Sequence, residues 1–184
     1  IAIILSTLVT GVMGIVTSKL IPEMPIKVTC AGFIFTALLL IVSAIIGKKR
    51  AEKANASDNE KGITWIQALV IGFMQGIGTL PGVSRSGSTI SGAMFSGLDR
   101  KIAGDYSFII SIPAILGAFI LEVKDLDEVS GSIGLAPIMV GCTAAFIVGY
   151  LSLALLMKMI RKGKLQWFAA YLIPLGILGM IFLH

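Results

Sequence analysis

A short polar run, Gly78–Thr89, interrupts an otherwise apolar stretch of the sequence and carries a single charge. Arg85 is the only charged residue between Lys61 and Asp99. Its guanidinium is a planar fork of N–H donors that matches the oxygens of a phosphate. A charged group inside a membrane segment is costly, and is by default a candidate functional group. The run therefore points to the binding of an anion.

Hydroxyl and glycine residues surround Arg85. Glycines permit positive φ and close backbone approach, and hydroxyls donate hydrogen bonds. We expect the next helix to begin near Ser88, so that its free N–H groups and positive dipole end point into the same cavity. The predicted phosphate ligands are the hydroxyls of Ser84, Ser86, Ser88 and Thr89, with close approach allowed by Gly82 and Gly87.

Two structural interpretations of this region stay open. Arg85 can instead pair with a carboxylate on another helix and hold two helices together. The pairs Gly72 with Gly76, and Gly78 with Gly82, have the spacing of close helix packing.

Two further polar residues each allow two interpretations. Gln75 can make an interhelical hydrogen bond or take part in the site. Asp105 can be an acid in the first turn of a helix, where a carboxylate is favourable, or can act near the site. Pro113 predicts a kink in the helix that follows Asp105.

Apolar helices must position the polar run. The chain has 184 residues, 56% hydrophobic and 14% charged, with a mean hydropathy of +0.96. Soluble domains carry about 25% charged residues, so water is not the main solvent. We predict an all-α, polytopic transmembrane helical bundle that forms one integral membrane domain over 1–184. Its predicted spans are about 1–21, 28–46, 102–123, 135–157 and 167–183.

Charged loops orient these spans. Residues 47–62 and 158–164 are basic and are expected in the cytoplasm, whereas the acidic loop 124–134 is expected outside. Residues 63–98 then start and end in the cytoplasm, but are too few for two crossings at about 1.5 Å per residue. We predict a re-entrant helix–loop–helix over 63–98, because irregular backbone inside a membrane is tolerated only when buried in protein or lining a wet cavity.

Several classes of function are excluded or disfavoured. The net charge of +5 lies in short clusters between apolar runs, so no nucleic-acid partner is expected. The only histidine is His184, which excludes a multi-histidine metal site and a two-histidine lipid phosphatase. Cys30 and Cys142 lie in apolar runs and are expected to be buried small residues. The start at Ile1 lacks the charged region of a signal peptide, and we expect a piece of a longer protein.

Residues 75–91, QGIGTLPGVSRSGSTIS, resemble the second signature of the undecaprenyl-diphosphate phosphatase family of the bacitracin-resistance type. The Asp105–Phe108 run and the helix with Pro113 resemble the family's second half. The resemblance implies one half of an inverted-repeat fold in the bacterial inner membrane. It also implies hydrolysis of undecaprenyl diphosphate to undecaprenyl phosphate and phosphate, which recycles the lipid carrier of peptidoglycan synthesis and confers bacitracin resistance.

The resemblance also assigns roles. It makes Arg85 the phosphate-binding arginine, and it implies a divalent cation, Mg²⁺ or Ca²⁺, whose ligands are unknown. The family's earlier motif, with two glutamates and a serine–serine–threonine–glycine–histidine run, does not occur in this chain. We therefore expect the carboxylates and the nucleophile elsewhere, with Ser84 or Ser86 as a second choice. The remaining implied site residues are the pocket hydroxyl Thr89, the loop glycines Gly82 and Gly87, and the polar position Gln75.

The expected partners are a polyprenyl diphosphate lipid, the bilayer and, as a further option, a second copy in a homodimer. The main alternative is a lipid-phosphate flippase, because re-entrant helices at a midplane site are also a transporter architecture. An enzyme releases phosphate in detergent, whereas a flippase needs a sealed bilayer. A purely structural subunit predicts that Arg85 pairs with an acid.

Overall fold

The computed structural model describes residues 1–20, 25–51, 62–123 and 135–182. Within those ranges the chain forms helices and no strand, which confirms the predicted all-α fold class. The predicted loop 124–134, half of the predicted turn 22–27 and most of the predicted basic loop 47–62 lie outside the described residues. The helices are α1 Ala2–Leu20, α2 Ile26–Ala51, α3 Trp65–Ile77, α4 Arg85–Phe95, α5 Arg100–Val123, α6 Leu135–Arg161 and α7 Trp167–Phe182.

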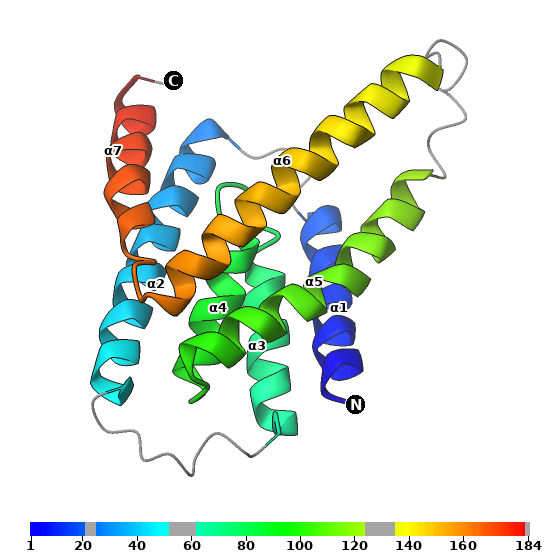
Figure 1. The fold of residues 1–184 in the computed structure, drawn as a ribbon. Coiled ribbons are helices and arrows are strands. Elements are labelled where there is room, and N and C mark those ends of the chain that lie inside the picture. Colours follow the sequence, from blue (N-terminus) through cyan, green and yellow to red (C-terminus); the bar gives the residue numbers. More distant parts are fainter. Residues whose placement is uncertain (21–24, 52–61, 124–134, 183–184) are drawn as a thin grey trace.

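Two short helices, α3 and α4, form a hairpin in the middle of the bundle (Figure 1). On one side the hairpin packs against α2, which runs beside α7, and on the other side against α1 and α5. The last long helix, α6, meets α5 and leads away from the bundle (Figure 1). A helix–break–helix is therefore present where the sequence predicts one, over 63–98.

Within the described ranges, three helices are long and apolar enough to cross a membrane: 26–50 in α2, 100–120 in α5 and 136–161 in α6. The apolar helices α1 and α7 are shorter, so their predicted crossings stay predictions. Two spans run past their predicted ends, α2 to Ala51 instead of 46 and α6 to Arg161 instead of 157. Their last turns are rich in Lys and Arg, which are good helix formers and are favourable at a helix C-terminus.

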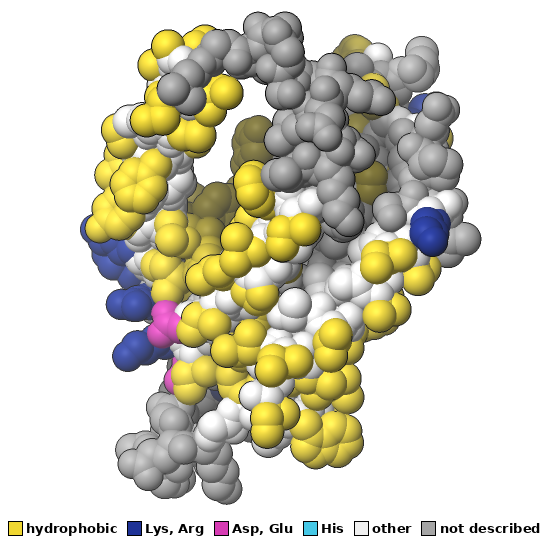
Figure 2. All heavy atoms as spheres, turned by 90° about the vertical axis from the view of Figure 1, so that its right-hand side faces the viewer, with side chains coloured by type: hydrophobic (Ala, Val, Ile, Leu, Met, Phe, Trp, Pro, Cys, Tyr) yellow, Lys and Arg dark blue, Asp and Glu magenta, His cyan; other side chains and the backbone are white. Residues whose placement is uncertain are grey.

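On the face shown in Figure 2, most of the described side chains are hydrophobic, and Lys and Arg side chains lie near its margins. On α6, Val140 and Phe146 are 70% and 74% exposed. An apolar surface of this extent is unfavourable in water and is typical of contact with lipid. Cys142 lies on the same helix and is exposed, so the expectation that it is buried is wrong, whereas Cys30 is buried.

Close packing joins α1 to α3. A Cβ added at Gly72 would lie 2.6 Å from the Ser6 carbonyl oxygen, and one added at Gly76 would lie 2.5 Å from the Met13 Cβ. The Thr10 hydroxyl donates to the Gly72 carbonyl at 3.1 Å. The helix-packing interpretation of Gly72 with Gly76 is thus confirmed.

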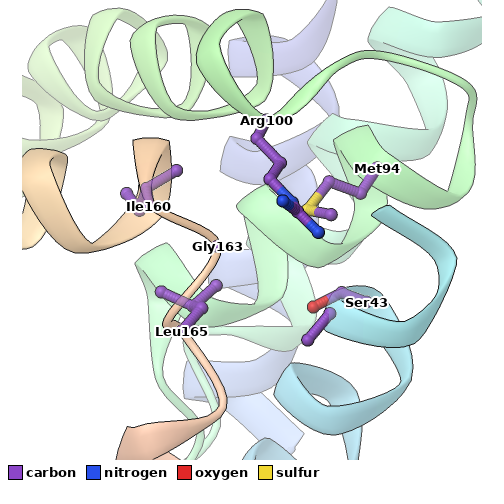
Figure 3. A pocket seen from close by; sticks show the side chains of 7 residues that line it. Ser43, Met94, Arg100, Ile160, Gly163 and Leu165 are labelled. Carbon is purple, nitrogen blue, oxygen red and sulfur yellow. The ribbon is translucent and has the colours of Figure 1, made fainter. Parts of the chain in front are cut away.

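A cavity of about 10 Å³ lies between α2, the end of α4 and the turn that joins α6 to α7 (Figure 3). The Arg100 side chain points into it, beside Ser43 and Met94 (Figure 3). A space of this size holds about one water molecule. It lies near the basic helix ends and not at the polar run.

Candidate phosphate site

The base of the α3–α4 hairpin is closed by side chains. Thr64 and Gln67 form a reciprocal capping box at the start of α3, with Thr64 N–H donating to Gln67 Oε1 at 2.9 Å. Gln67 Nε2 also donates to the Ser96 carbonyl at the end of α4, at 3.2 Å. Arg50, in the last turn of α2, donates to the Met94 carbonyl at 2.7 Å. The two helix ends are thus fixed to each other and to α2.

The tip of the hairpin is a tight turn. Gly78 ends α3, and the Val83 N–H donates to the Leu80 carbonyl at 3.0 Å. Between them stand Pro81 and Gly82, and Gly82 has φ +78°. Proline at the second and a positive-φ glycine at the third position are typical of a type II turn. Gly78 and Gly82 therefore do not form a helix-packing pair, because Gly82 lies in the turn.

The turn rests directly on the backbone of α2. A Cβ added at Gly82 would lie 1.9 Å from the Thr29 carbonyl oxygen, and one added at Gly32 would lie 2.5 Å from the Pro81 carbonyl oxygen. Thr36, one turn further along, accepts a hydrogen bond from the Ser84 N–H at 3.0 Å. Thr29, Gly32 and Thr36 thus form one stripe of α2, the α2 socket, that holds the tip.

The depth of the tip can be measured along α2. Thr36 stands ten residues after Ile26 and fifteen before Ala51, or about 15 Å and 22 Å at 1.5 Å per residue. The base of the hairpin lies at the other, basic end of α2, where Arg50 contacts Met94. The N-cap Ser84 is therefore level with the apolar middle of a membrane-length helix, whereas the Pro81–Gly82 turn lies nearer the start of that helix, against Thr29 and Gly32.

The returning helix α4 begins at Arg85, three residues before the predicted start near Ser88. Ser84 is its N-cap, and the Ser84 hydroxyl accepts from the Gly87 N–H at 3.1 Å. This cap explains the earlier start. Because the first N–H groups of a helix lack intrahelical partners, those of Arg85 and Ser86 stay without one among the described residues. The positive end of the α4 dipole lies at the same place.

The Arg85 side chain is exposed at this helix start. Only two carboxylates have described side chains. Asp99 accepts from the Ile102 N–H at 2.7 Å, and Asp105 pairs with Arg161 at 3.6 Å. Asp99 lies just before α5, and Arg161 follows Ile160, which lines a cavity with Met94 at the end of α4. Both carboxylates are thus near the end of α4, a helix about 16 Å long that begins at Arg85. Within the described ranges Arg85 therefore has no acidic partner, which disfavours its interpretation as a structural salt bridge, and Asp105 lies away from the break.

The other predicted ligands differ in how open they are. Ser86 is half-buried, and its hydroxyl makes no hydrogen bond to the described part of the chain. Thr89 is 2% exposed, and its hydroxyl donates to the Arg85 and Ser86 carbonyls at 3.0 and 3.1 Å. Ser88 is fully buried. In this arrangement Arg85 and Ser86 are open to a ligand, whereas Ser88 and Thr89 are not.

Gln75 lies inside the bundle. It is 0% exposed, and its Nε2 donates to the Ile110 carbonyl of α5 at 3.5 Å. Pro113 has no N–H to donate to the carbonyl four residues earlier, that of Ile109, and Ile110 is the next residue of the same helix. The structure thus places Gln75 as an interhelical contact at this point of α5.

The glycines of the run serve packing. A Cβ added at Gly87 would lie 3.0 Å from the Ser84 Oγ and 3.4 Å from the Thr36 Cγ2, and one added at Gly78 would lie 2.6 Å from the Arg85 Cα. Gly78, Gly82 and Gly87 therefore let the turn, the cap and α2 approach one another.

Sequence analysis missed the α2 socket. Residues 28–46 were interpreted only as a span, although Thr29, Gly32 and Thr36 recur at spacings of three and four. That spacing places small and hydroxyl residues on one helix face, which is a signal for close helix contact. Their partner was not apparent, because the tip lies more than forty residues further along the chain.

A divalent cation does not fit the described residues of the break. Mg²⁺ and Ca²⁺ sites use carboxylate oxygens, and neither Asp99 nor Asp105 is near Arg85. Among the described residues, no three His, Cys, Asp or Glu side chains are placed so that they could hold a metal ion.

Comparison with known proteins identifies the family of the chain. Residues 1–178 match the family model described as bacitracin resistance protein BacA. The chain is 46% identical to the undecaprenyl-diphosphatase of Treponema denticola over 176 aligned residues. The alignment covers 96% of this chain and 62% of that protein. It is 36% identical to the enzyme of that name from Methanosphaera stadtmanae, over 97% of this chain and 62% of that protein. The chain thus spans about three fifths of the length of these relatives. With its apolar helices, the chain is a multi-pass membrane protein that belongs to the bacitracin resistance protein BacA family.

Proposed function

We propose that the chain forms the phosphate-binding half of an enzyme that hydrolyses undecaprenyl diphosphate to undecaprenyl phosphate and phosphate. The observation that carries the proposal is the start of α4, where an exposed arginine adjoins the backbone N–H groups of Arg85 and Ser86, and neither the guanidinium nor the two N–H groups have a partner in the described part of the chain. The relatives named undecaprenyl-diphosphatase support the substrate. Such a reaction would recycle the lipid carrier of peptidoglycan synthesis and account for bacitracin resistance.

The proposed mechanism assigns electrostatic stabilisation to this half. The lipid tail stays in the bilayer while the diphosphate reaches the break. A nucleophile attacks the terminal phosphorus, and the bond between that phosphorus and the bridging oxygen breaks. The bridging oxygen keeps the electron pair and leaves as part of the lipid monophosphate. Arg85, the two free N–H groups and the Ser86 hydroxyl donate to the phosphoryl oxygens on which charge grows.

The attacking group needs a base, and the described residues place no carboxylate or imidazole at the break. Ser84 is a poor nucleophile here, because its hydroxyl already accepts from the Gly87 N–H. Ser86 remains the second-choice nucleophile. The nucleophile and base are therefore expected beyond the residues described. A bound Mg²⁺ or Ca²⁺, and a homodimer, stay predictions of the resemblance.

The test separates the enzyme from a flippase. The protein, expressed from its complete gene and purified in detergent, is given undecaprenyl diphosphate, and free phosphate is measured. Release of phosphate in detergent supports the enzyme. No release in detergent, together with movement of the lipid across sealed vesicles, would favour the flippase.

A further inference from the structure

We propose that Thr36 of α2 is a positioning residue for the phosphate site, acting through the Ser84 N–H. This inference rests on the proposed function, because it concerns how the same site is held. Thr36 is 0% exposed and touches the break from a helix that carries none of the predicted ligands. It acts on Arg85 and Ser86 through the backbone that precedes them.

The hydroxyl of Thr36 serves two groups of the tip at once. It accepts from the Ser84 N–H at 3.0 Å and donates to the Gly82 carbonyl at 3.5 Å, the long limit of such a bond. A buried helical threonine often donates instead to the carbonyl one turn earlier in its own helix, as Thr10 does to Ser6. The bridge across to the tip therefore fixes the backbone on both sides of Val83.

The residue that Thr36 holds, Ser84, is the one that sets where α4 begins. The Ser84 N–H belongs to the N-cap residue, and the cap hydroxyl in turn holds the Gly87 N–H. Without Thr36, a partly buried donor at the cap would lose its partner, which is unfavourable. The next two residues are Arg85 and Ser86, so a shift of the cap moves the donors to the phosphate. Misplacement by about 1 Å can cost about a hundredfold in rate.

The experiment compares two variants at one position with a matched control. Thr36→Val keeps the branched shape and removes the hydroxyl, whereas Thr36→Ser keeps the hydroxyl and removes the methyl. Thr10→Val is the control, because it also removes a buried threonine hydroxyl that bonds to another helix, at Gly72, but does not contact the break. The full-length gene product is examined in detergent by hydrogen exchange of the Ser84 amide and by the kcat and KM of phosphate release.

We expect Thr36→Val to speed exchange of the Ser84 amide about tenfold or more, as loss of a buried hydrogen bond predicts. We expect its kcat to fall about tenfold with a smaller change in KM, since misplaced donors weaken transition-state stabilisation. Thr36→Ser should restore both, and Thr10→Val should change neither by more than about threefold.

Each other result has a definite meaning. The positioning role is overturned if the Ser84 amide of Thr36→Val exchanges as slowly as in the parent. It is also overturned if that amide exchanges faster but the variant has the same kcat as an active parent. A serine variant as slow as the valine variant assigns the effect to packing and also overturns it. If the parent itself releases no phosphate while the exchange differences appear, the proposed function fails, whereas the hold of Thr36 on the break stands.

Discussion

The backbone N–H of Ser84 donates a 3.0 Å hydrogen bond to the hydroxyl of Thr36, 48 residues earlier in the chain. This contact joins the N-cap of α4 to the middle of α2. It places an otherwise irregular turn against a helix long enough to cross a membrane. The proposed phosphate site thus depends on two packed elements and not on the polar run alone.

Gly82→Ala tests the seat of the turn on α2. The new Cβ would lie 1.9 Å from the Thr29 carbonyl oxygen at a residue with φ +78°. Strained backbone and overpacking each cost about 1–3 kcal/mol, so we expect a large loss of folded, monodisperse protein in detergent. The control is Gly117→Ala on α5, where nothing lies within 4 Å. Equal yields and melting temperatures for both variants would contradict the close contact.

Arg50→Met tests the base of the hairpin. The change removes the 2.7 Å bond to the Met94 carbonyl at the end of α4. Because Arg50 is exposed, we expect only about 0.5–1 kcal/mol of destabilisation, seen as a lower melting temperature. Lys49→Met removes the neighbouring charge of the same helix and should have a smaller effect. If the melting temperature falls as much in Lys49→Met as in Arg50→Met, the destabilisation comes from the lost charge and not from the bond to the Met94 carbonyl.

Gln75→Leu separates the two interpretations of Gln75. The side chain is fully buried, its Nε2 makes one hydrogen bond of 3.5 Å among the described residues, and its Oε1 has no partner there. Replacement of such a group by an apolar one of similar size is often nearly neutral. We therefore expect a melting temperature close to that of the parent and phosphate release within about threefold of it. A loss of about a hundredfold in turnover by a stably folded variant would instead make Gln75 a site residue.

The sequence was sufficient to predict the break but not its support. One arginine among glycines and hydroxyls predicts a polar interruption in an apolar segment, and the charged loops predict that the segment returns to its own side. The start of α4 was placed too late, because Ser84 was counted as a phosphate ligand and not as an N-cap. Thr89 was counted as a pocket hydroxyl, but a threonine within a helix can bond to the preceding turn, and here it does.

Long-range packing explains the remaining differences. The α2 socket depends on a contact between residues far apart in sequence, and no local pattern identifies which helix will receive the turn. The exposure of Cys142 has a similar origin, since an apolar run does not reveal which of its faces meets protein and which meets lipid. The spacing of Thr29, Gly32 and Thr36 shows that one face of α2 is suited to a close neighbour, but not which neighbour.

The most direct test of the central claim is the rate of phosphate release from undecaprenyl diphosphate by Arg85→Ala, in the full-length gene product in detergent. Arg161→Ala is the matched control, because that arginine forms an exposed pair with Asp105 away from the break. If Arg85 stabilises the charge of the transition state, its variant loses about a hundredfold or more in kcat, while the control stays within about threefold. An Arg85→Ala enzyme as fast as its parent would contradict the account.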